Sequence, residues 1–393
     1  MALPRLGDLL AQGLRGQRVL VRADLNVPLR GSRVADDSRI RASLPTLERL
    51  LGAGARVIVI SHLGRPKGRR LPEFSLRPLA PRLAELLGTG ISFRGECIGP
   101  VAAEAVEELG PGQILLLENL RYHAGEEAND PDFARALASL ADAYVNDAFG
   151  TAHRAHGSTV GVPALVGRRA AGELLAAELE HLEAVRRPER PLLVILGGAK
   201  VSDKLAVLEA LAPHADTLAI GGAMAYTFLM ARGEPHGDSL VEPERVEDAR
   251  RVTRAARDSG RRLLLPVDHL VADRIGEDAA TQIVRQIPDG WKAVDIGPET
   301  AALYAKEARA ARTVFWNGPM GVFEVERFAR GTETVARAVA ESGGVTVVGG
   351  GDSLAAVNAA GVAGRITHLS TGGGASLEYV QGLTLPGVAA LER

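Results

Sequence analysis

Polar and mostly basic side chains follow four short apolar runs in the first half of the sequence. They are Asp24 and Asn26, His62 and Arg65, Arg121, and His153, Arg154 and His156, with Arg39 as a further candidate. Guanidinium and imidazole groups next to Gly or Asn suit a small ligand with several negative charges. A single arginine of this kind is more simply explained by a surface ion pair of little energetic value. The same chemistry after four runs, however, predicts an anion site.

Glycine-rich loops follow the apolar runs of the second half, namely ILGGAKVSDK, AIGGAM, VVGGGDS and STGGGAS. Glycine lets the main chain approach a ligand closely, and a helix after the loop presents free N–H groups and a positive dipole end to phosphate. One Gly-Gly turn between a strand and a helix can also serve tight packing alone. The four loops together predict a nucleotide site.

Lysine is scarce, because only five of the 46 basic residues are lysine. Lys200 and Lys204 are four residues apart where a helix is expected to start, so both ammonium groups could face one phosphate chain, although chance spacing on a solvated face gives the same pattern. Lysine is a compact charge that can follow a moving phosphoryl group. Asp352 in GGGDS is a candidate magnesium ligand, because nucleotide-bound Mg²⁺ keeps waters and needs one or two carboxylates. A helix N-cap role for Asp352 is compatible with this one.

The apolar runs that position these residues alternate with helical patterns, which predicts α/β architecture with buried parallel strands. The runs are Val19–Val21, Val57–Ile60, Ile114–Leu117, Ala143–Val145, Leu192–Leu196, Leu218–Ile220, Leu263–Leu265, Val314–Trp316 and Val345–Val348. In such sheets ligands bind at the carboxyl ends of the strands, where the polar and glycine residues lie. The expected fold is two doubly wound parallel-sheet lobes.

The length of 393 residues exceeds what one hydrophobic core usually serves, so two domains are expected. Between the halves, Leu175, Leu179, Leu182 and Val185 form one apolar stripe on a helix that ends before Pro188. From the pattern alone this segment is either an interlobe helix or an ordinary surface helix.

The composition narrows the partners and the compartment. A net charge of -2 argues against nucleic acid or an anionic membrane surface as the main partner. The single cysteine, Cys97, cannot form an internal disulfide, and no signal-like start or long apolar run is present. A cytoplasmic protein is expected, with no nucleic-acid and no membrane partner.

Other enzyme classes lack their motifs in this sequence. The P-loop G-x-x-x-x-G-K-[ST], the protein-kinase H-R-D segment, a complete dinucleotide fingerprint, H-E-x-x-H, paired CxxC and G-x-S-x-G are all absent. Two alternatives stay open. A non-catalytic binder of sugar phosphates would have no use for Lys200 with Asp352, and a nicotinamide-dependent dehydrogenase would need the missing glycine fingerprint with an acidic residue about 20 positions on.

Nine segments in order resemble the motif series of the phosphoglycerate kinase family. They are VRADLNVP, SHLGRPKG, LENLRYH, NDAFGTAHRAH, GGAKVSDK, GPET, WNGPMGVFE, VVGGGDS and STGGGASLE, and they extend from residue 21 to residue 378. Nine motifs in order across both halves are highly specific. Leu25, where Phe is usual, and His269, where an aliphatic residue is usual, depart from the pattern without touching a charged role.

The resemblance implies a substrate lobe at residues 1–170 with residues 381–393 packing back on it, an interlobe helix at 171–187 and a nucleotide lobe at 188–380. The implied 3-phosphoglycerate site is Asp24, Leu25, Asn26, Arg39, His62, Leu63, Gly64, Arg65, Arg121 and Arg154. The implied nucleotide site is Lys204, Gly297, Glu324, Gly350, Gly351, Asp352 and Ser353, with Asp352 on Mg²⁺. The groups implied around the phosphoryl in flight are Arg39, Lys200, Lys204, Gly372, Gly373 and Gly374.

The implied reaction is reversible phosphoryl transfer from 1,3-bisphosphoglycerate to ADP, giving 3-phosphoglycerate and ATP in glycolysis and gluconeogenesis. Transfer of this kind is a direct in-line displacement in which positioning and charge stabilisation dominate. Both the carboxylate and the terminal ADP oxygen are already ionised near neutral pH, so no general base is needed. Lobe closure would bring the substrates together and exclude water, and a monomer is expected.

Overall fold

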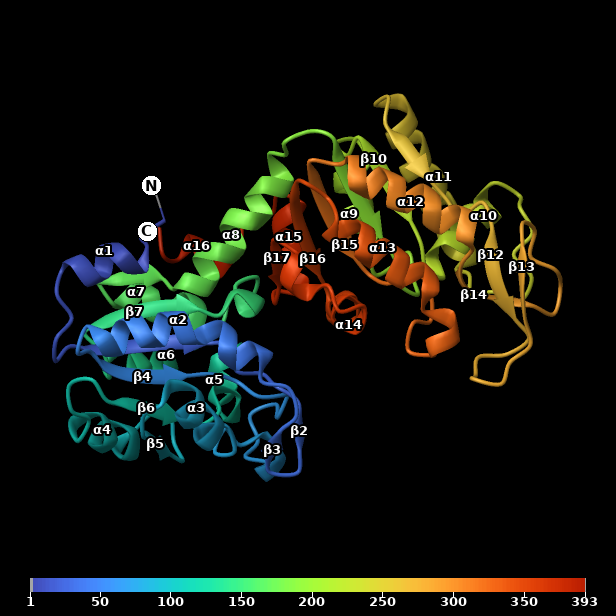
Figure 1. The fold of residues 1–393 in the computed structure, drawn as a ribbon. Helices are drawn as coiled ribbons and strands as arrows, with labels where there is room; N and C mark the ends of the chain where they lie inside the picture. Colours follow the sequence, from blue (N-terminus) through green and yellow to red (C-terminus); the bar gives the residue numbers. More distant parts are fainter. Residues whose placement is uncertain (1–2, 393) are drawn as a thin grey trace. The chain divides into compact units, whose positions relative to one another are not determined.

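The computed structural model describes residues 3–392, which divide into two compact units (Figure 1). Unit 1 consists of Met1–Leu179 and Thr384–Arg393, and unit 2 consists of Glu180–Leu383. The predicted lobe limits at residues 1 and 393 lie outside the described residues. Each unit has its own parallel sheet with helices, so the predicted α/β class with two sheet-based lobes is confirmed.

Unit 1 is built on six parallel strands in the order β5-β6-β4-β1-β7-β8. The strands are β1 (Arg18–Ala23), β4 (Arg56–Ile60), β5 (Ile91–Arg94), β6 (Ile114–Leu117), β7 (Ala143–Asp147) and β8 (Arg169–Ala171). The four predicted runs of the first half correspond to β1, β4, β6 and β7. Strand order reverses between β1 and β7, which makes this the topological switch point, where ligands bind in open parallel sheets.

Helices and one small hairpin complete unit 1. The helices are α1 (Leu6–Ala11), α2 (Ser38–Gly52), α3 (Leu79–Leu87), α4 (Pro100–Glu107), α5 (Ala124–Glu127), α6 (Pro131–Ala138), α7 (Val162–Leu165) and α16 (Pro386–Ala389). The hairpin pairs β2 (Leu29–Arg30) with β3 (Arg33–Val34). Local sequence sets the starts of helices: Asp130 caps α6 by accepting hydrogen bonds of 2.9 Å from the N–H groups of Asp132 and Phe133, and Pro131 fits the first helical position.

Unit 2 contains a second sheet of six parallel strands in the order β11-β10-β9-β15-β16-β17. The strands are β9 (Leu192–Leu196), β10 (Thr217–Ile220), β11 (Arg262–Leu264), β15 (Thr313–Asn317), β16 (Val345–Gly349) and β17 (His368–Ser370). All five predicted runs of the second half correspond to strands here. The order reverses between β9 and β15, so the carboxyl ends of these two strands flank the second switch point.

A three-stranded antiparallel sheet in unit 2 was not predicted. It pairs β12 (His269–Ala272) with β13 (Thr281–Val284) and β14 (Lys292–Ile296). The remaining helices are α9 (Leu205–Leu211), α10 (Met224–Ala231), α11 (Val246–Asp258), α12 (Pro298–Ala310), α13 (Arg330–Ala340), α14 (Gly351–Ala359) and α15 (Gly374–Val380). A core that includes Tyr304 of α12, Trp316 of β15 and Val335 of α13 packs α12, α13 and α14 against the parallel sheet.

One helix, α8 (Glu173–Arg186), occupies the segment predicted as an interlobe helix, and the division between the two units falls inside it (Figure 1). The four residues of its predicted stripe, Leu175, Leu179, Leu182 and Val185, are all buried. The helix therefore contributes apolar side chains to the packing on both sides of the division.

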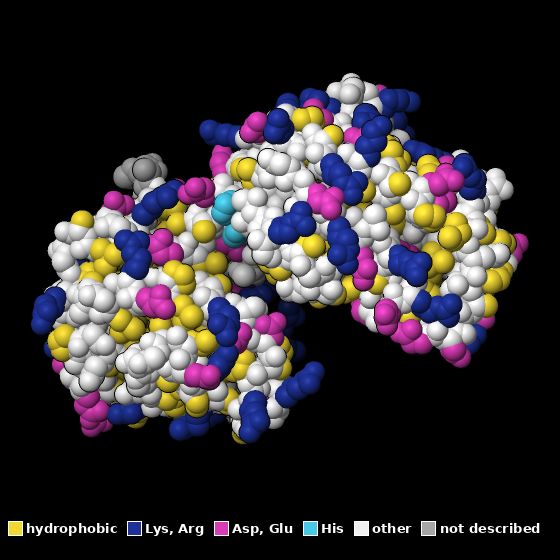
Figure 2. All heavy atoms as spheres, in the orientation of Figure 1, with side chains coloured by type: hydrophobic (Ala, Val, Ile, Leu, Met, Phe, Trp, Pro, Cys, Tyr) yellow, Lys and Arg dark blue, Asp and Glu magenta, His cyan; other side chains and the backbone are white. Residues whose placement is uncertain are grey.

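Charged side chains of both signs are interspersed over the face of the molecule in Figure 2, in keeping with the nearly balanced composition. None of the helices in the described part of the chain combines the length and the apolar character needed to span a bilayer.

Candidate active site

The candidate anion site of unit 1 lies at its switch point. Asp24 follows β1, and Gly150 follows β7. The two residues are so close that a Cβ on Gly150 would be 2.4 Å from Asp24 Oδ2. Asp24 is buried and forms an ion pair with Arg39 of α2, whose side chain keeps 32 % of its surface exposed. Asp24 thus orients a guanidinium that stays open to a ligand.

A network of hydrogen bonds holds the loops after β4 and β6 together. Asn26 Oδ1 accepts from the N–H of Gly64 at 2.9 Å, and Arg121 Nη1 donates to the Gly64 carbonyl at 2.8 Å. Asn119 Nδ2 donates to the Leu63 carbonyl at 2.8 Å, while its Oδ1 accepts from the Arg121 N–H at 3.0 Å. Gly64 has a φ of +60°, which a residue with a side chain rarely adopts. The loops are therefore fixed before any ligand binds.

Burial and like charges shape the electrostatics of this edge. Burial lowers the pKa of His62 well below its ordinary value, and the positive charges of Arg22 and Arg121 lower it further. Burial also lowers the pKa of His156 to about 4, with Arg121 as the next cause. The imidazoles are therefore neutral near pH 7, and the net positive charge at this edge comes from arginine.

The other predicted residues of unit 1 differ in their surroundings. Leu25 and Leu63 are buried in the unit's core, where their side chains serve packing. Arg65 is exposed, and Arg154 is partly exposed with its Nε donating to His153 Nε2 at 3.3 Å. The structure thus brings most of the predicted polar residues to one sheet edge and leaves Arg65 at the surface of the same loop.

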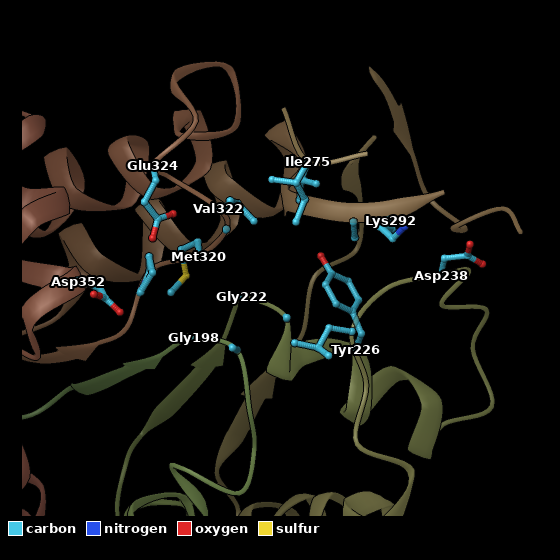
Figure 3. A pocket seen from close by; sticks show the side chains of 17 residues that line it. Gly198, Gly222, Tyr226, Asp238, Ile275, Lys292, Met320, Val322, Glu324 and Asp352 are labelled. Carbon is cyan, nitrogen blue, oxygen red and sulfur yellow. The ribbon is translucent and has the colours of Figure 1, made fainter. Parts of the chain in front are cut away.

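In unit 2 a cavity of about 530 Å³ lies at the carboxyl ends of β9 and β10 and the start of the loop after β15. Its residues are Gly198, Ala199, Gly222, Ala223, Tyr226, Asp238, Leu240, Ile275, Lys292, Ala293, Val294, Pro319, Met320, Gly321, Val322, Glu324 and Asp352. Figure 3 shows Glu324 and Asp352 at one end of the cavity and Asp238 and Lys292 at the other, with Tyr226 on the side of Lys292. Its size and largely apolar lining suit a small ligand with a ring.

Glycines at two strand ends let the backbone line this cavity. A Cβ on Gly222, whose φ is +65°, would be 2.5 Å from the Gly198 nitrogen, so neither loop could come so close with a larger residue there. Both glycines belong to the loops ILGGAKVSDK and AIGGAM that the glycine pattern marked as ligand-binding.

The two lysines near the cavity occupy different environments. Lys204 is the residue before α9, and its Nζ donates to Asn317 Oδ1 at the end of β15. Burial lowers the pKa of Lys204, and the negative charges of Asp203 and Asp352 oppose this shift. Lys200 is exposed in the loop before α9. The prediction that a helix starts at these lysines is wrong, because α9 begins only at Leu205, after a turn through residues 202–204. The spacing of four residues therefore does not by itself bring the two ammonium groups together.

Asp352 lies in the first turn of α14, is exposed, and lines one end of the cavity (Figure 3). Within the described ranges no group of three or more His, Cys, Asp or Glu residues could hold a metal ion by itself. One open carboxylate beside a nucleotide-sized cavity fits Mg²⁺ that takes its other ligands from phosphate and water. The predicted ligand therefore has the surroundings that this role needs.

Two further glycine loops lead into helices at the same edge. Gly350 precedes α14 with a φ of +90°, and Ser353 Oγ in the first turn of α14 accepts a 2.6 Å hydrogen bond from the N–H of Gly318. Gly373, with a φ of +52°, precedes α15 at Gly374, while the N–H of Gly372 donates to Ser370 Oγ at 3.2 Å. Gly351 begins α14, so its amide is among those without a partner inside the helix.

Known proteins resemble this chain over nearly its whole length. A family model described as phosphoglycerate kinase matches residues 9–383. The chain is 57% identical over 381 residues to the phosphoglycerate kinase of Moorella thermoacetica, covering 96% of this chain and 97% of that protein. It is also 57% identical over 381 residues to the enzyme of Rubrobacter xylanophilus, covering 96% of each. The chain belongs to the phosphoglycerate kinase family.

A solved structure agrees with this assignment. The phosphoglycerate kinase of Coxiella burnetii matches with a TM-score of 0.90 and 39% identity, covering 100% of this chain and 99% of that one. The resemblance stated from the nine motifs is thereby confirmed.

One residue that the phosphoglycerate kinase motifs predict for the nucleotide site lies elsewhere in unit 2. Gly297 precedes α12, where a Cβ would be 2.3 Å from Asp268, and it lines a second cavity of about 520 Å³ together with Asp295 and Ile296. Lys292 and Val294 on the same strand line the first cavity instead. The start of β14, through Val294, thus lines the cavity that contains Asp352, whereas the end of the strand and Gly297 after it line the second one.

Sequence reasoning missed several residues of the cavity. Tyr226 of α10 is 2 % exposed with its hydroxyl pointing toward Ile275, and Lys292 comes from the unpredicted antiparallel sheet. Met320 and Val322 follow β15 inside the recognised WNGPMGVFE segment. The scarcity of lysine was a usable signal for Lys292, since it marked this residue as clearly as Lys200 and Lys204. Nothing in the sequence marked Tyr226.

Proposed function

We propose that this member of the phosphoglycerate kinase family catalyses reversible phosphoryl transfer between 1,3-bisphosphoglycerate and ADP, with 3-phosphoglycerate bound to unit 1 and Mg²⁺-nucleotide bound to unit 2. The observation that carries the proposal is the difference between the two switch points. One presents arginines and neutral imidazoles to a small anion, and the other presents a glycine-lined cavity of about 530 Å³ with a carboxylate at its end.

Arg39 and Arg121 would hold the anionic acceptor in unit 1, with Asn26 and His62 as uncharged hydrogen-bonding groups. Glu324, Lys204 and the Gly350–Ser353 turn would hold the nucleotide. This division follows from the positions of the side chains at separate sheets, together with the preference of guanidinium groups for carboxylate and phosphate oxygens.

In the transfer step, positive groups would surround a planar, negatively charged phosphoryl group that needs no proton from the protein. Arg39, Lys200 and the backbone of Gly372, Gly373 and Gly374 at the start of α15 are the groups we assign to it, with Lys204 beside them. Mg²⁺ on Asp352 would supply further positive charge to the nucleotide phosphates when bound. Donor and acceptor must come within bonding reach, so closure of the two units in each turnover belongs to the proposal.

We also propose a cytoplasmic monomer. Cys97 is buried and unpaired, and burial raises the pKa of its thiol, which suits a reducing compartment and makes a disulfide-linked dimer unfavourable. Light scattering on the purified chain tests this part, and a mass of twice 41.3 kDa would contradict it.

The decisive test of the function is a coupled assay with 3-phosphoglycerate, ATP and Mg²⁺, in which formation of 1,3-bisphosphoglycerate is followed through reduction by a dehydrogenase. Turnover is expected with Mg²⁺ and is expected to stop when EDTA is added. Saturable binding of 3-phosphoglycerate without turnover would favour the non-catalytic binding protein instead.

A further inference from the structure

Arg22 is a buried arginine that the proposed mechanism does not use. It lies on β1, two residues before Asp24, and its side chain has an exposed fraction of 0%. Its Nε donates to Ser158 Oγ at 2.9 Å, its Nη1 donates to the Ala23 carbonyl at 2.5 Å, and its Nη2 lies 3.2 Å from His62 Nδ1. A buried guanidinium that is shielded from water needs such partners, because an unpaired buried charge is strongly destabilising.

The contact with His62 fixes the position of a proton. Arginine has five N–H donors and no acceptor, so Nη2 can form a hydrogen bond to Nδ1 only by donating to its lone pair. Nδ1 of His62 therefore carries no hydrogen. A neutral imidazole in this arrangement carries its hydrogen on Nε2, for which the structure gives no partner among the described residues.

A carboxylate on the far side of Arg22 completes the arrangement. Ser158 accepts from Arg22 Nε, so its hydroxyl hydrogen is free to donate to Glu126 Oε1, which lies 2.6 Å away. The Ser158 N–H donates to Glu126 Oε2 at 2.8 Å, and Glu126 is 0% exposed. Glu126 thus balances the charge of Arg22 through one serine, and every donor in the series has a defined direction.

The groups that face His62 oppose a second proton on its ring. Arg22 on β1, Arg39 on α2, Arg121 after β6 and His156 after β7 all lower the pKa of His62, and burial is the largest cause. The His62 ring therefore carries one hydrogen only, and this hydrogen is on Nε2.

We propose that Arg22 is a positioning residue that holds His62 as the neutral tautomer with its hydrogen on Nε2, so that His62 presents a hydrogen-bond donor of fixed direction to the anionic acceptor. The choice of acceptor rests on the proposed function, whereas the tautomer follows from the geometry alone. The phosphoryl acceptor is thus recognised by arginine charge together with one neutral donor that does not titrate in the physiological range.

The tautomer is tested first on the unmodified full-length chain by long-range ¹H–¹⁵N correlation spectra of its histidines, with His62→Asn to assign the His62 signals. The expected result is the pattern of hydrogen on Nε2 and no imidazolium from about pH 5.5 to 8, with the free ring pKa near 6.5 as reference. Hydrogen on Nδ1, or titration of His62 near pH 6.5, would overturn the proposal.

The role of Arg22 is tested with the double variant Arg22→Met/Glu126→Gln, which removes both buried charges together. His62 is then expected to titrate closer to pH 6.5. The KM of the double variant for 3-phosphoglycerate, divided by the KM of the unmodified enzyme, should therefore change severalfold between about pH 5.5 and 8. Taking the ratio cancels the ionisation of the substrate itself. Arg22→Lys, which keeps the charge and a donor, should restore most of the flat profile.

Arg169→Met is the matched control, because Arg169 is another arginine of unit 1 and donates to the Pro163 carbonyl at 2.9 Å with no histidine partner. Its KM ratio should not depend on pH. A flat ratio in the double variant together with an unchanged His62 spectrum would show that Arg22 only packs. If the double variant does not fold, Arg22→Lys is used instead. Its His62 spectrum should keep the pattern of hydrogen on Nε2, and a pattern of hydrogen on Nδ1 would overturn the proposal. Absence of turnover in every form would reject the proposed function while the spectra still decide the tautomer.

Discussion

At the scale of single residues, Lys200 and Lys204 show how far environment separates two identical side chains. Lys204 is partly buried and held by Asn317, whereas Lys200 is exposed on the loop before α9. A held ammonium can contribute equally to the bound substrate and to the transition state. An exposed lysine that no such contact holds is suited to follow the phosphoryl group as its charge redistributes.

We therefore expect Lys200→Met to lower kcat by ~10²-fold or more with little change in the KM of either substrate, the usual scale for losing one group that stabilises transition-state charge. Steady-state kinetics with 3-phosphoglycerate and MgATP measure both constants. Lys306→Met, at an exposed position of α12, is the matched control and should leave kcat unchanged. A normal kcat with a raised KM for ATP alone would assign Lys200 to ground-state binding.

Arg121 offers a test of the division between the two sites. Removing its guanidinium in Arg121→Ala should raise the KM for 3-phosphoglycerate by ~10- to 100-fold, the usual value of a charged hydrogen bond. The affinity for MgADP, measured by calorimetry, should stay the same because Arg121 belongs to unit 1. Arg154→Ala should act in the same direction. Weakened MgADP binding in either variant would contradict the assignment of the two ligands to separate units.

At the scale of elements, α8 depends on a buried carboxylate at the end of β7. Asp147 Oδ1 accepts from the N–H groups of Leu174 and Leu175 at 2.9 and 3.4 Å and so caps the start of α8. A Cβ on Gly172 would be 2.1 Å from this oxygen, which explains a glycine immediately before the helix. Burial raises the pKa of Asp147 to about 7.

This raised pKa predicts a pH dependence of unit 1 stability. Between about pH 4 and 7 the folded state keeps a proton that the unfolded state has lost, so the contribution of Asp147 to the free energy of unfolding falls as the pH rises through this range. In Asp147→Asn the fall should be absent. The stability of the unmodified chain relative to the variant, from urea unfolding followed by circular dichroism, should therefore decrease from pH 5 to pH 8.

Tryptophan fluorescence provides the internal control for this experiment, because both tryptophans, Trp291 and Trp316, belong to unit 2. The fluorescence transition should have the same midpoint in both proteins at each pH. A difference between the two proteins that does not vary with pH would mean that Asp147 keeps its charge when buried.

The elements that the sequence predicted share a strong signal. Eight of the nine apolar runs became central strands, because buried central strands of parallel sheets are apolar on both faces, and the ninth became the edge strand β11. The edge strands β8 and β17 have three residues each, and β13 is partly exposed along its whole length, so their side chains carry no such pattern. The same signal predicted part of the site, because residues directly after central strands could be recognised from the sequence. Lys292 and Tyr226 could not, since they come from elements whose position only the folded chain determines.

At the scale of the whole molecule, a turnover that uses one site on each unit requires the units to approach. A ligand shifts an equilibrium between open and closed forms only by its different affinity for the two, and groups on both units meet the phosphoryl group together only when closed. We expect small-angle scattering to give a smaller radius of gyration with 3-phosphoglycerate and MgADP together than with either alone. An unchanged radius in the presence of both, with full activity, would exclude closure.

The C-terminal segment belongs to unit 1 although all of unit 2 precedes it in the chain. The N–H of Gly387 donates to the Ala152 carbonyl at 2.8 Å, and Leu385 and Leu391 are buried. During synthesis all residues of unit 2 are therefore joined before Thr384 and the residues that follow it, at a pace of about 5–20 residues per second. Unit 1, which is translated first, therefore lacks Leu385 and Leu391 for the ~10–40 seconds that the addition of residues 180–383 takes at this pace.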